Sequence, residues 1–354
     1  MPFLFIGSTG NHAGKSLLTW AIARRLVEKG LNVGFMKPFG TQPVHINGMW
    51  TDQDAALLKE ALNLQEPFER ICPYPVSEDG WREKNKEVIV KELKILAQGL
   101  SSGKDVLLIM GTQHIFFDES PCPVPDTALI NALQSDTILV NRYQQPSSSL
   151  YSILSVSSLL KERLKGVLLN RVSPEMLEGI IDQTIPSLSE KGIPMMTAVP
   201  EDPILSLQTL GDIKETLDGK SLCEEESLGK PIGGMTVSSS DLEGELLIFK
   251  RVYNKIVLLE PTSLDTESGA APRAITGILL TGGRTPPPQA VKACEKAHVA
   301  LILVEEDTFS AQERLEQYPA RLSPKDETKV RYFTDFLDRN GALDTLLQSL
   351  PVLS

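Results

Sequence analysis

Residues 7–16 read GSTGNHAGKS, directly after the apolar run FLFIG at residues 3–7, and this stretch decides the fold of the first part of the chain. It matches the phosphate-binding pattern G-x-x-x-x-G-K-[ST], except that Thr9 stands at the first glycine position. Between a strand and a helix, such a loop offers backbone N–H groups and the positive end of the helix to a phosphate. We predict that Lys15 reaches the β- and γ-phosphates of a nucleotide and that Ser16 ligates Mg²⁺.

The whole loop is expected to contact the nucleotide. The predicted contacts are Thr9, Gly10, Asn11, His12, Ala13, Gly14, Lys15 and Ser16. A protonated His12 could meet a phosphate, but we favour the interpretation that its imidazole merely lines the loop. The alternative for the whole stretch is a glycine-bearing turn with an exposed lysine, which the strand and helix on either side disfavour.

Short apolar runs alternate with amphipathic stretches through the first two hundred residues. A helix is expected over residues 17–30, ended by Gly30. Strands are expected at residues 3–7, 32–38, 105–111, 136–142, 166–172 and 194–200. Such nearly continuous apolar strands are typical of a mostly parallel sheet covered by helices on both faces. The sequence therefore predicts a doubly wound α/β domain with a P-loop.

The sequence changes character near Thr209, where an acidic stretch and a glycine- and serine-rich segment follow. Strand patterns resume at residues 254–261, 275–283 and 299–307, with helices expected at residues 286–297 and 330–350. A chain of 354 residues is long enough for two domains with full cores. We therefore predict a nucleotide-binding domain at residues 1–208 and a smaller α/β domain with a C-terminal helix at residues 209–354.

Composition and charge disfavour several classes of protein. The formal net charge is −11 and both halves of the chain are acidic, which disfavours a nucleic-acid partner. The sequence has no apolar run of about 18 residues that could span a bilayer, and it shows no export signal. We therefore expect a soluble, cytoplasmic protein that binds neither nucleic acid nor a membrane.

Cysteine and histidine positions give no metal-binding or disulfide pattern. The cysteines, which form no C-x-x-C pair, are Cys72, Cys122, Cys223 and Cys294. Among the histidines, His114 follows an apolar strand and is a site candidate, whereas His45 and His298 are interpreted as surface residues. Since no G-x-S-x-G motif occurs either, a metallohydrolase or serine hydrolase is disfavoured.

The loop, its helix and the following NVGFMKPFGTQP at residues 32–43 resemble dethiobiotin synthetase and its relatives, including the cobyrinic acid a,c-diamide synthase group. In these families the loop also carries threonine at the first glycine position, so Thr9 is a family trait. The resemblance implies ATP and Mg²⁺ as cofactors. It also implies that Lys37, in the Lys37-Pro38 pair, approaches the phosphates and the substrate and acts with Lys15 as a catalytic residue.

Two further site residues follow from the same resemblance. Asp54, in DQDAALL, matches the family's Mg²⁺-binding aspartate, and Asn170, in GVLLNRVSPE, matches the asparagine that reads the adenine edge. The alternative for Asp54 is a helix-start carboxylate beside Asp52, which the helix dipole favours. The segment TAVPEDP at residues 197–203 resembles the family's turn beside the base, or it is a plain strand-ending turn.

The resemblance fails at the end of the third core strand. Dethiobiotin synthetases carry a glutamate there as a second Mg²⁺ ligand, whereas this chain has Met110, and a thioether is a poor ligand for a hard cation. Asp118 and Glu119, in the following loop, are the candidates to replace it. The loss of this carboxylate argues against efficient phosphoryl transfer.

A second resemblance covers most of residues 1–325. The chain is similar to the N-terminal regulatory half of long bacterial phosphate acetyltransferases, in which a dethiobiotin synthetase-like domain precedes a domain named for its D-R-T-G-G motif. The residues that this implies as ligand contacts of the second domain are Thr281, Gly282, Gly283, Asp307 and Thr308. The Asp-Arg pair is missing, so an anion would need Arg273 or Arg284; the alternative is a plain strand-to-helix turn.

Three functional hypotheses remain open. The preferred one is a regulatory or sensor protein that couples ATP binding to an unidentified small-molecule effector or a partner of the second domain. The rival is an ATP-dependent carboxylate-activating ligase, or a weak ATPase, in which Lys37 steadies an anion. The third is a scaffold without a ligand. Because the sequence ends at Ser354, acetyl transfer by this chain is not expected, and the larger relatives make a homo-oligomer compatible with the resemblance.

Overall fold

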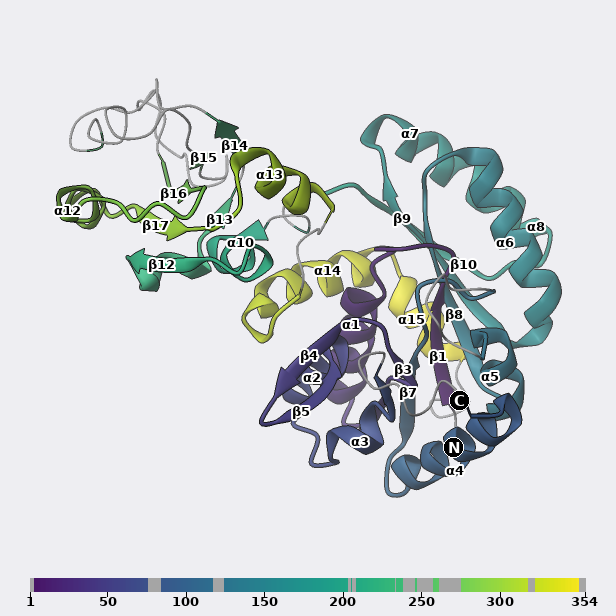
Figure 1. The fold of residues 1–354 in the computed structure, drawn as a ribbon. Helices are drawn as coiled ribbons and strands as arrows, with labels where there is room; N and C mark the ends of the chain where they lie inside the picture. The colour runs from purple at the N-terminus through teal and green to yellow at the C-terminus, as the bar shows by residue number, and fades with distance from the viewer. Residues whose placement is uncertain are drawn as a thin grey trace. The chain divides into compact units, whose positions relative to one another are not determined.

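The computed structural model of the chain forms two compact units (Figure 1). The first consists of residues 1–202 together with residues 322–354, and the second consists of residues 203–321. The residues that the structure describes are 3–75, 84–116, 124–202, 205, 208–232, 234–237, 246, 257–260, 275–317 and 322–349. In the order of the chain, the second unit is therefore an insertion into the first.

A six-stranded parallel sheet forms the centre of the first unit, in the order β10-β9-β8-β1-β7-β2. Its strands are β1 (Phe3–Ser8), β2 (Val33–Met36), β7 (Val106–Met110), β8 (Asp136–Arg142), β9 (Leu164–Val172) and β10 (Met195–Pro200). The predicted doubly wound α/β fold is confirmed. The strand order reverses at β1, and such a switch point is where open α/β sheets bind ligands.

Helices cover both faces of this sheet (Figure 1). They are α1 (Lys15–Glu28), α2 (Gln53–Ala61), α3 (Phe68–Ile71), α4 (Lys86–Ser101), α5 (Asp126–Leu133), α6 (Pro146–Leu160), α7 (Pro174–Gly179), α8 (Ile185–Glu190), α14 (Glu327–Arg339) and α15 (Ala342–Ser349). The 3₁₀ turns η2 (Lys161–Arg163) and η7 (Pro324–Asp326), the π-helical η3 (Ile180–Thr184) and the short strands β3 (Phe39–Gly40), β4 (Pro43–Ile46), β5 (Met49–Asp52) and β6 (Tyr74–Pro75) complete the unit. Among the described residues, none of the helices combines the length and the apolar composition that a membrane span requires.

Strand side chains alternate between two buried faces. Phe5 packs into the core beneath α4, α5 and α6, a cluster that includes Leu93 and Val156. Its neighbours Leu4 and Ile6 are also 0% exposed and belong to the opposite face of the sheet. Because both faces are covered, the strands read as continuous apolar runs, which is why the sequence identified them.

The second unit has a mixed five-stranded sheet in the order β12-β17-β16-β15-β14. Its elements are β11 (Gln208–Thr209), α10 (Leu210–Thr216), β12 (Lys220–Cys223), η4 (Glu225–Gly229), β13 (Pro231–Ile232), β14 (Gly234–Val237), β15 (Val257–Glu260), β16 (Gly277–Leu280), α12 (Pro288–Ala297), β17 (Ala300–Leu303) and α13 (Thr308–Gln317). Ile278 and Leu280 of β16 share a core with α12, whereas Leu279 shares one with α10 and α13. A second α/β unit is therefore present, as expected.

The C-terminal segment differs from the sequence-based expectation. We expected one helix at residues 330–350 within the second domain, but α14 packs against α1 and so belongs to the first unit, where Figure 1 draws it in yellow. Phe333 of α14 is 1% exposed, and Arg25 of α1 pairs with Asp338 of α14 at 3.6 Å. The helix is also broken at Gly341, whose φ of 66° ends α14. A local pattern shows that a helix is amphipathic, but not which core its apolar face joins.

Candidate functional site

The predicted phosphate loop lies at the carboxyl end of β1 and leads into α1. Gly14, the N-cap of α1, has a φ of 98°, which a residue with a side chain rarely adopts. A Cβ added there would also lie 2.3 Å from Nδ2 of Asn170. Glycine at position 14 is therefore required twice, by backbone conformation and by the close approach of a neighbouring strand.

Two asparagines at the ends of adjacent strands hold this loop. Nδ2 of Asn141, in β8, donates to Oγ1 of Thr9 at 2.8 Å. Nδ2 of Asn170, in β9, donates to the backbone oxygen of Ala13 at 2.7 Å. The sequence singled out Asn170 but not Asn141, although each asparagine precedes an arginine, in GVLLNRV and in DTILVNR, and this repeat could have indicated both. Contact of Asn170 with an adenine stays a prediction.

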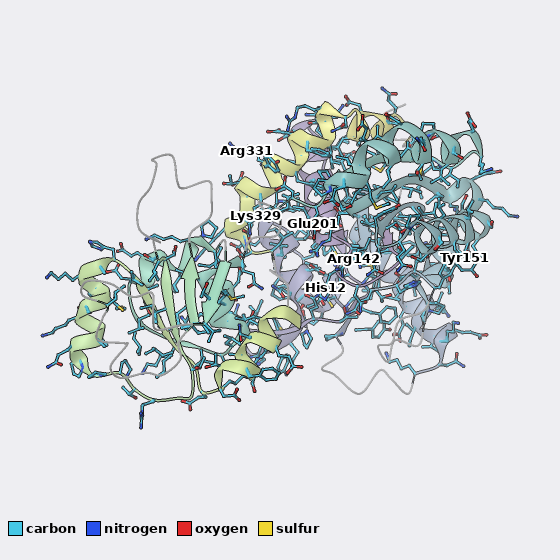
Figure 2. The ribbon with its side chains drawn as sticks, turned by 90° about the horizontal axis from the view of Figure 1, so that it is seen from above. His12, Arg142, Tyr151, Glu201, Lys329 and Arg331 are labelled. Atoms are coloured by element: carbon cyan, nitrogen blue, oxygen red, sulfur yellow. The ribbon has the colours of Figure 1, made fainter. Side chains whose placement is uncertain are left out.

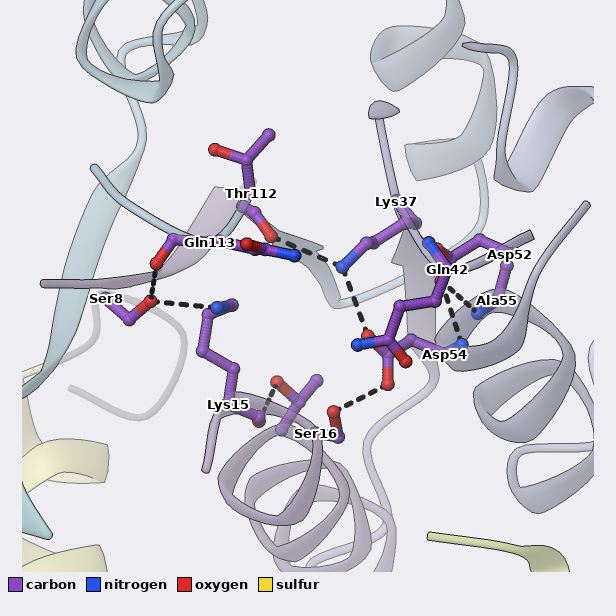
Figure 3. A network of polar contacts seen from close by, with 12 residues as sticks. Ser8, Lys15, Ser16, Lys37, Gln42, Asp52, Asp54, Ala55, Thr112 and Gln113 are labelled. Carbon is purple, nitrogen blue, oxygen red and sulfur yellow. Dashed lines mark hydrogen bonds and ion pairs between the residues drawn. The ribbon is translucent and has the colours of Figure 1, made fainter. Parts of the chain in front are cut away.

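Lys15, the first residue of α1, points back along the end of β1 (Figure 3). Its Nζ donates to Oγ of Ser8 at 2.8 Å. The Ser8 hydroxyl lies 2.8 Å from the backbone oxygen of Gln113, to which it donates. The loop lysine is therefore held at the carboxyl edge of the sheet, between the segments that follow β1 and β7.

Ser16, Lys37 and Asp54 meet in one network (Figure 3). Oγ of Ser16 donates to Oδ1 of Asp54 at 2.6 Å, and Nζ of Lys37 donates to Oδ2 of Asp54 at 3.1 Å. Both charged side chains are buried, with Lys37 2% and Asp54 8% exposed. Nζ of Lys37 also donates to the backbone oxygen of Gly111 at 3.3 Å. Three residues singled out separately in the sequence therefore form a single contact set, in which Lys37 and Asp54 are buried.

The charges of this network stabilise one another. Burial by itself would lower the pKa of Lys37, but the carboxylates of Asp54 and Asp52 outweigh burial and raise that pKa above its ordinary value. Burial would raise the pKa of Asp54, but Lys37 and the hydrogen bond from Ser16 lower it below its ordinary value. Lys37 and Asp54 are therefore a charged pair at neutral pH.

Asp52, rather than Asp54, caps the helix that follows. Oδ1 of Asp52 accepts the backbone N–H of Asp54 at 2.8 Å, and Oδ2 accepts that of Gln42 at 2.9 Å. Burial raises the pKa of Asp52 to about 6, although Lys37 acts against this shift. Because the capping role falls to Asp52, the Asp54 carboxylate is available to Ser16 and Lys37.

The residues present fit a magnesium ion. The hydroxyl of Ser16 and the carboxylate of Asp54 are hard oxygen ligands, which Mg²⁺ prefers. Over the described part of the chain, no group of three or more His, Cys, Asp or Glu side chains could hold a metal ion, so Mg²⁺ would also need nucleotide phosphates, as is usual.

The second acidic ligand of the family has no replacement among the described residues that the sequence proposed. The side chain of Met110 is fully buried and offers no oxygen, while Asp118 and Glu119 lie outside the described residues. Sequence reasoning missed Asp126, whose Oδ1 is buried without a hydrogen-bond partner.

The candidate residues of the second unit also lie together. Oγ1 of Thr281 is 2.7 Å from Oγ1 of Thr308. Gly282 and Gly283 both have positive φ, and their N–H groups donate to backbone oxygens after β17 at 2.6 and 2.9 Å. Asp307 accepts the N–H groups of the first turn of α13. These polar groups join the turn after β16 to the turn after β17. Ligand binding by them stays a prediction. Arg273 lies outside the described residues.

Two of the histidines lie at the phosphate loop. His12 lies within the loop at a φ of 52°, and His114 forms an isolated β-bridge with Thr9. His45 packs against Trp50 with ring centroids 5.1 Å apart, and His298 caps the end of α12. Free, buried thiols are found at Cys72, Cys223 and Cys294, and Cys122 lies outside the described residues.

Two family models match the chain in succession. One is described as an AAA domain and matches residues 3–209, and the other is described as a DRTGG domain and matches residues 212–318. Phosphate acetyltransferases match 93–98% of the chain, so this pair of domains in this order is consistent with the N-terminal region of such a protein, and the fold is that of a P-loop protein.

Relatives of both expected kinds are found. The phosphate acetyltransferase of Synechocystis sp. is 24% identical over 93% of this chain and 49% of its own length. The ATP-dependent dethiobiotin synthetase of Methanococcus vannielii is 25% identical over 53% of this chain and 88% of its own. The cell division protein MinD of Aquifex aeolicus aligns in structure over 58% of this chain and 84% of its own, with 16% identity and a TM-score of 0.34. The chain spans about half the length of the phosphate acetyltransferases that it matches.

Proposed function

This chain belongs to the AAA domain family over residues 3–209 and to the DRTGG domain family over residues 212–318, and on that premise we propose that it is an ATP-binding regulatory or sensor protein. The loop from Thr9 to Ser16 binds the phosphates of Mg²⁺·ATP, and Ser16 and Asp54 bind the cation. The second unit binds a small-molecule effector or a protein partner. The relatives named for ATP-dependent dethiobiotin synthesis support the choice of ATP.

The observation that carries the proposal is the buried pair of Lys37 and Asp54, to which Ser16 donates a hydrogen bond. An ammonium and a carboxylate in a buried pair cost desolvation energy, and replacement by apolar residues is often neutral or stabilising. Retention of this pair at the carboxyl edge of the sheet, 2.6 Å from the Ser16 hydroxyl, is therefore better explained by a ligand than by stability. Lys37 is placed to neutralise a phosphate that approaches the same edge.

Two features favour regulation over turnover. The strand end that would carry a second acidic ligand carries Met110, which is fully buried. In addition, α14, which packs against α1, begins soon after the inserted second unit ends at residue 321. A shift of α1 on nucleotide binding would therefore move α14, which begins close to the point where the chain leaves the second unit. Coupling of this kind requires each ligand to distinguish two states of the protein.

The alternative is an ATP-dependent ligase that activates a carboxylate as an acyl phosphate. The position of Lys37 favours it, because a fixed ammonium between the loop and the sheet edge can stabilise the negative charge that develops in phosphoryl transfer. Steady release of phosphate that rises on addition of a carboxylate substrate would favour this alternative over the regulatory function.

Thermal denaturation with and without Mg²⁺·ATP tests nucleotide binding. At a free ATP concentration one hundred times the Kd, binding stabilises the folded state by about 2.7 kcal/mol, which raises the Tm measurably. The variant Lys15→Ala should abolish most of this shift. An equal shift in the variant, or none in the wild type, would refute nucleotide binding by this loop, and a phosphate-release assay then separates regulator from enzyme.

A further inference from the structure

A buried carboxylate lies at the end of β7, outside the network of Ser16, Lys37 and Asp54. Asp126 is the first residue of α5 and is 0% exposed. Its Oδ2 accepts the backbone N–H of Thr112 at 2.9 Å. This hydrogen bond fixes the carboxylate against the segment that follows Met110, where the strand itself offers no acidic group.

The carboxylate also lies directly against Gly111. A Cβ added to Gly111 would be 2.1 Å from Oδ2 of Asp126, so a side chain at this position would displace the carboxylate. The backbone oxygen of the same glycine accepts the hydrogen bond from Nζ of Lys37 at 3.3 Å. Asp126 and Lys37 therefore contact the same residue at the edge of the predicted site.

The second carboxylate oxygen has no partner. Oδ1 of Asp126 is buried and accepts no hydrogen bond, an arrangement that costs stability and calls for an explanation. Burial raises the pKa of Asp126 to about 7, while Lys15 and Lys37 act in the opposite direction. Both lysines of the predicted phosphate site therefore interact electrostatically with a carboxylate that has one oxygen without a hydrogen-bond donor.

We propose that Asp126 supplies the acidic group that Met110 does not, with its unpaired Oδ1 accepting a hydrogen bond from a water molecule held by the Mg²⁺ of the bound nucleotide. The inference rests on the proposed function. Mg²⁺ dehydrates reluctantly and usually keeps several waters, so a carboxylate can position it without direct contact. Asp126 is then a positioning residue on the cation side of the site, with Ser16 and Asp54 as the direct ligands.

Calorimetric titration of the full chain with ATP, once with Mg²⁺ and once with EDTA, tests this role. The variant Asp126→Asn keeps the shape of the side chain and an acceptor for the Thr112 N–H. We expect it to reduce the Mg²⁺-dependent gain in ATP affinity by about tenfold, a loss typical of groups that orient a metal through its ligands. The affinity in EDTA should stay within about twofold of the wild-type value, since the phosphate loop is unchanged.

Asp136→Asn is the matched control. Asp136 is the first residue of β8, at the amino end of this strand, where it pairs with Lys165 at 3.8 Å, and its replacement likewise converts one aspartate to asparagine. This control should bind ATP as the wild type does under both conditions. Equal weakening of ATP by Asp126→Asn in Mg²⁺ and in EDTA, or no weakening at all, would overturn the inference. A wild-type protein that binds no ATP in either condition would overturn the proposed function along with it.

Discussion

Ser16 and Asp54 are 38 positions apart in the sequence, and the hydroxyl of Ser16 donates a 2.6 Å hydrogen bond to Oδ1 of Asp54. The first residue of this pair belongs to α1 and the second to α2, so these two helices converge on one carboxylate. The other oxygen of that carboxylate is paired with Lys37. A substitution of any one of these three residues therefore tests its contacts with the other two.

Removing the charge of Asp54 should destabilise the first unit. Asp54→Asn leaves the buried ammonium of Lys37 without its hydrogen-bonded anion, and breaking a buried ion pair in this way costs about 3–5 kcal/mol. The double variant Lys37→Met with Asp54→Asn should recover part of this loss, because no unpaired buried charge remains. Urea unfolding followed by tryptophan fluorescence measures both, since Trp20 and Trp50 belong to the first unit and the sequence has no tryptophan at residues 203–321. A double variant as unstable as the sum of the two single variants would contradict a coupled pair.

Gly14 should not tolerate alanine. Gly14→Ala would place a side chain at a φ of 98°, against Nδ2 of Asn170, and we expect a loss of at least about 1 kcal/mol together with weaker ATP binding. Gly179→Ala is the control, because a Cβ at that position meets nothing within 4 Å. The Tm of each variant, with and without ATP, is the measurement. An unchanged ATP-induced shift in Gly14→Ala would show that the loop conformation is not needed for binding.

The pH dependence of stability should reveal the buried carboxyl of Asp126. Its pKa is raised from 3.8 to about 7 by burial, so between these values the folded chain holds a proton that the unfolded chain has released. The contribution of Asp126 to the free energy of unfolding is therefore fully present below about pH 4. It falls by about 1.4 kcal/mol per pH unit as the pH rises to 7. Asp126→Asn should become steadily more stable than the wild type over this range and keep a constant difference above it. Parallel curves for the two proteins in urea unfolding would refute a raised pKa.

The C-terminal helix should be required for the stability of the first unit. Phe333→Ala removes a side chain that is 1% exposed on the helix packed against α1, a change that typically costs about 3–5 kcal/mol. Arg331 lies on the exposed side of α14 (Figure 2), with 62% of its side chain accessible, so Arg331→Ala should cost less than about 1 kcal/mol. The urea midpoint from tryptophan fluorescence, which follows the first unit, separates the two. Equal midpoints would contradict the placement of α14.

The sequence by itself determined the parallel sheet and the position of the phosphate loop. Both depend on local patterns. Strands that are covered on two faces must be apolar along their whole length, and the turn before α1 needs a glycine followed directly by residues that begin a helix. The same patterns placed Lys15 and Ser16 at the start of α1, and the resemblance to dethiobiotin synthetase singled out Lys37 and Asp54. Neither source showed that Asp52 caps the helix and leaves Asp54 for Ser16 and Lys37.

Only the tertiary structure decided which distant residues share an environment. The burial of Asp126 against Gly111, the bracing of the loop by Asn141 and Asn170, and the return of α14 to α1 all join residues that no short pattern connects. A single sequence records how apolar a helix face is, but which core that face enters depends on the packing of the whole chain. The charge state of a buried carboxyl depends in the same way on its neighbours in space, so it follows from the fold rather than from the residue.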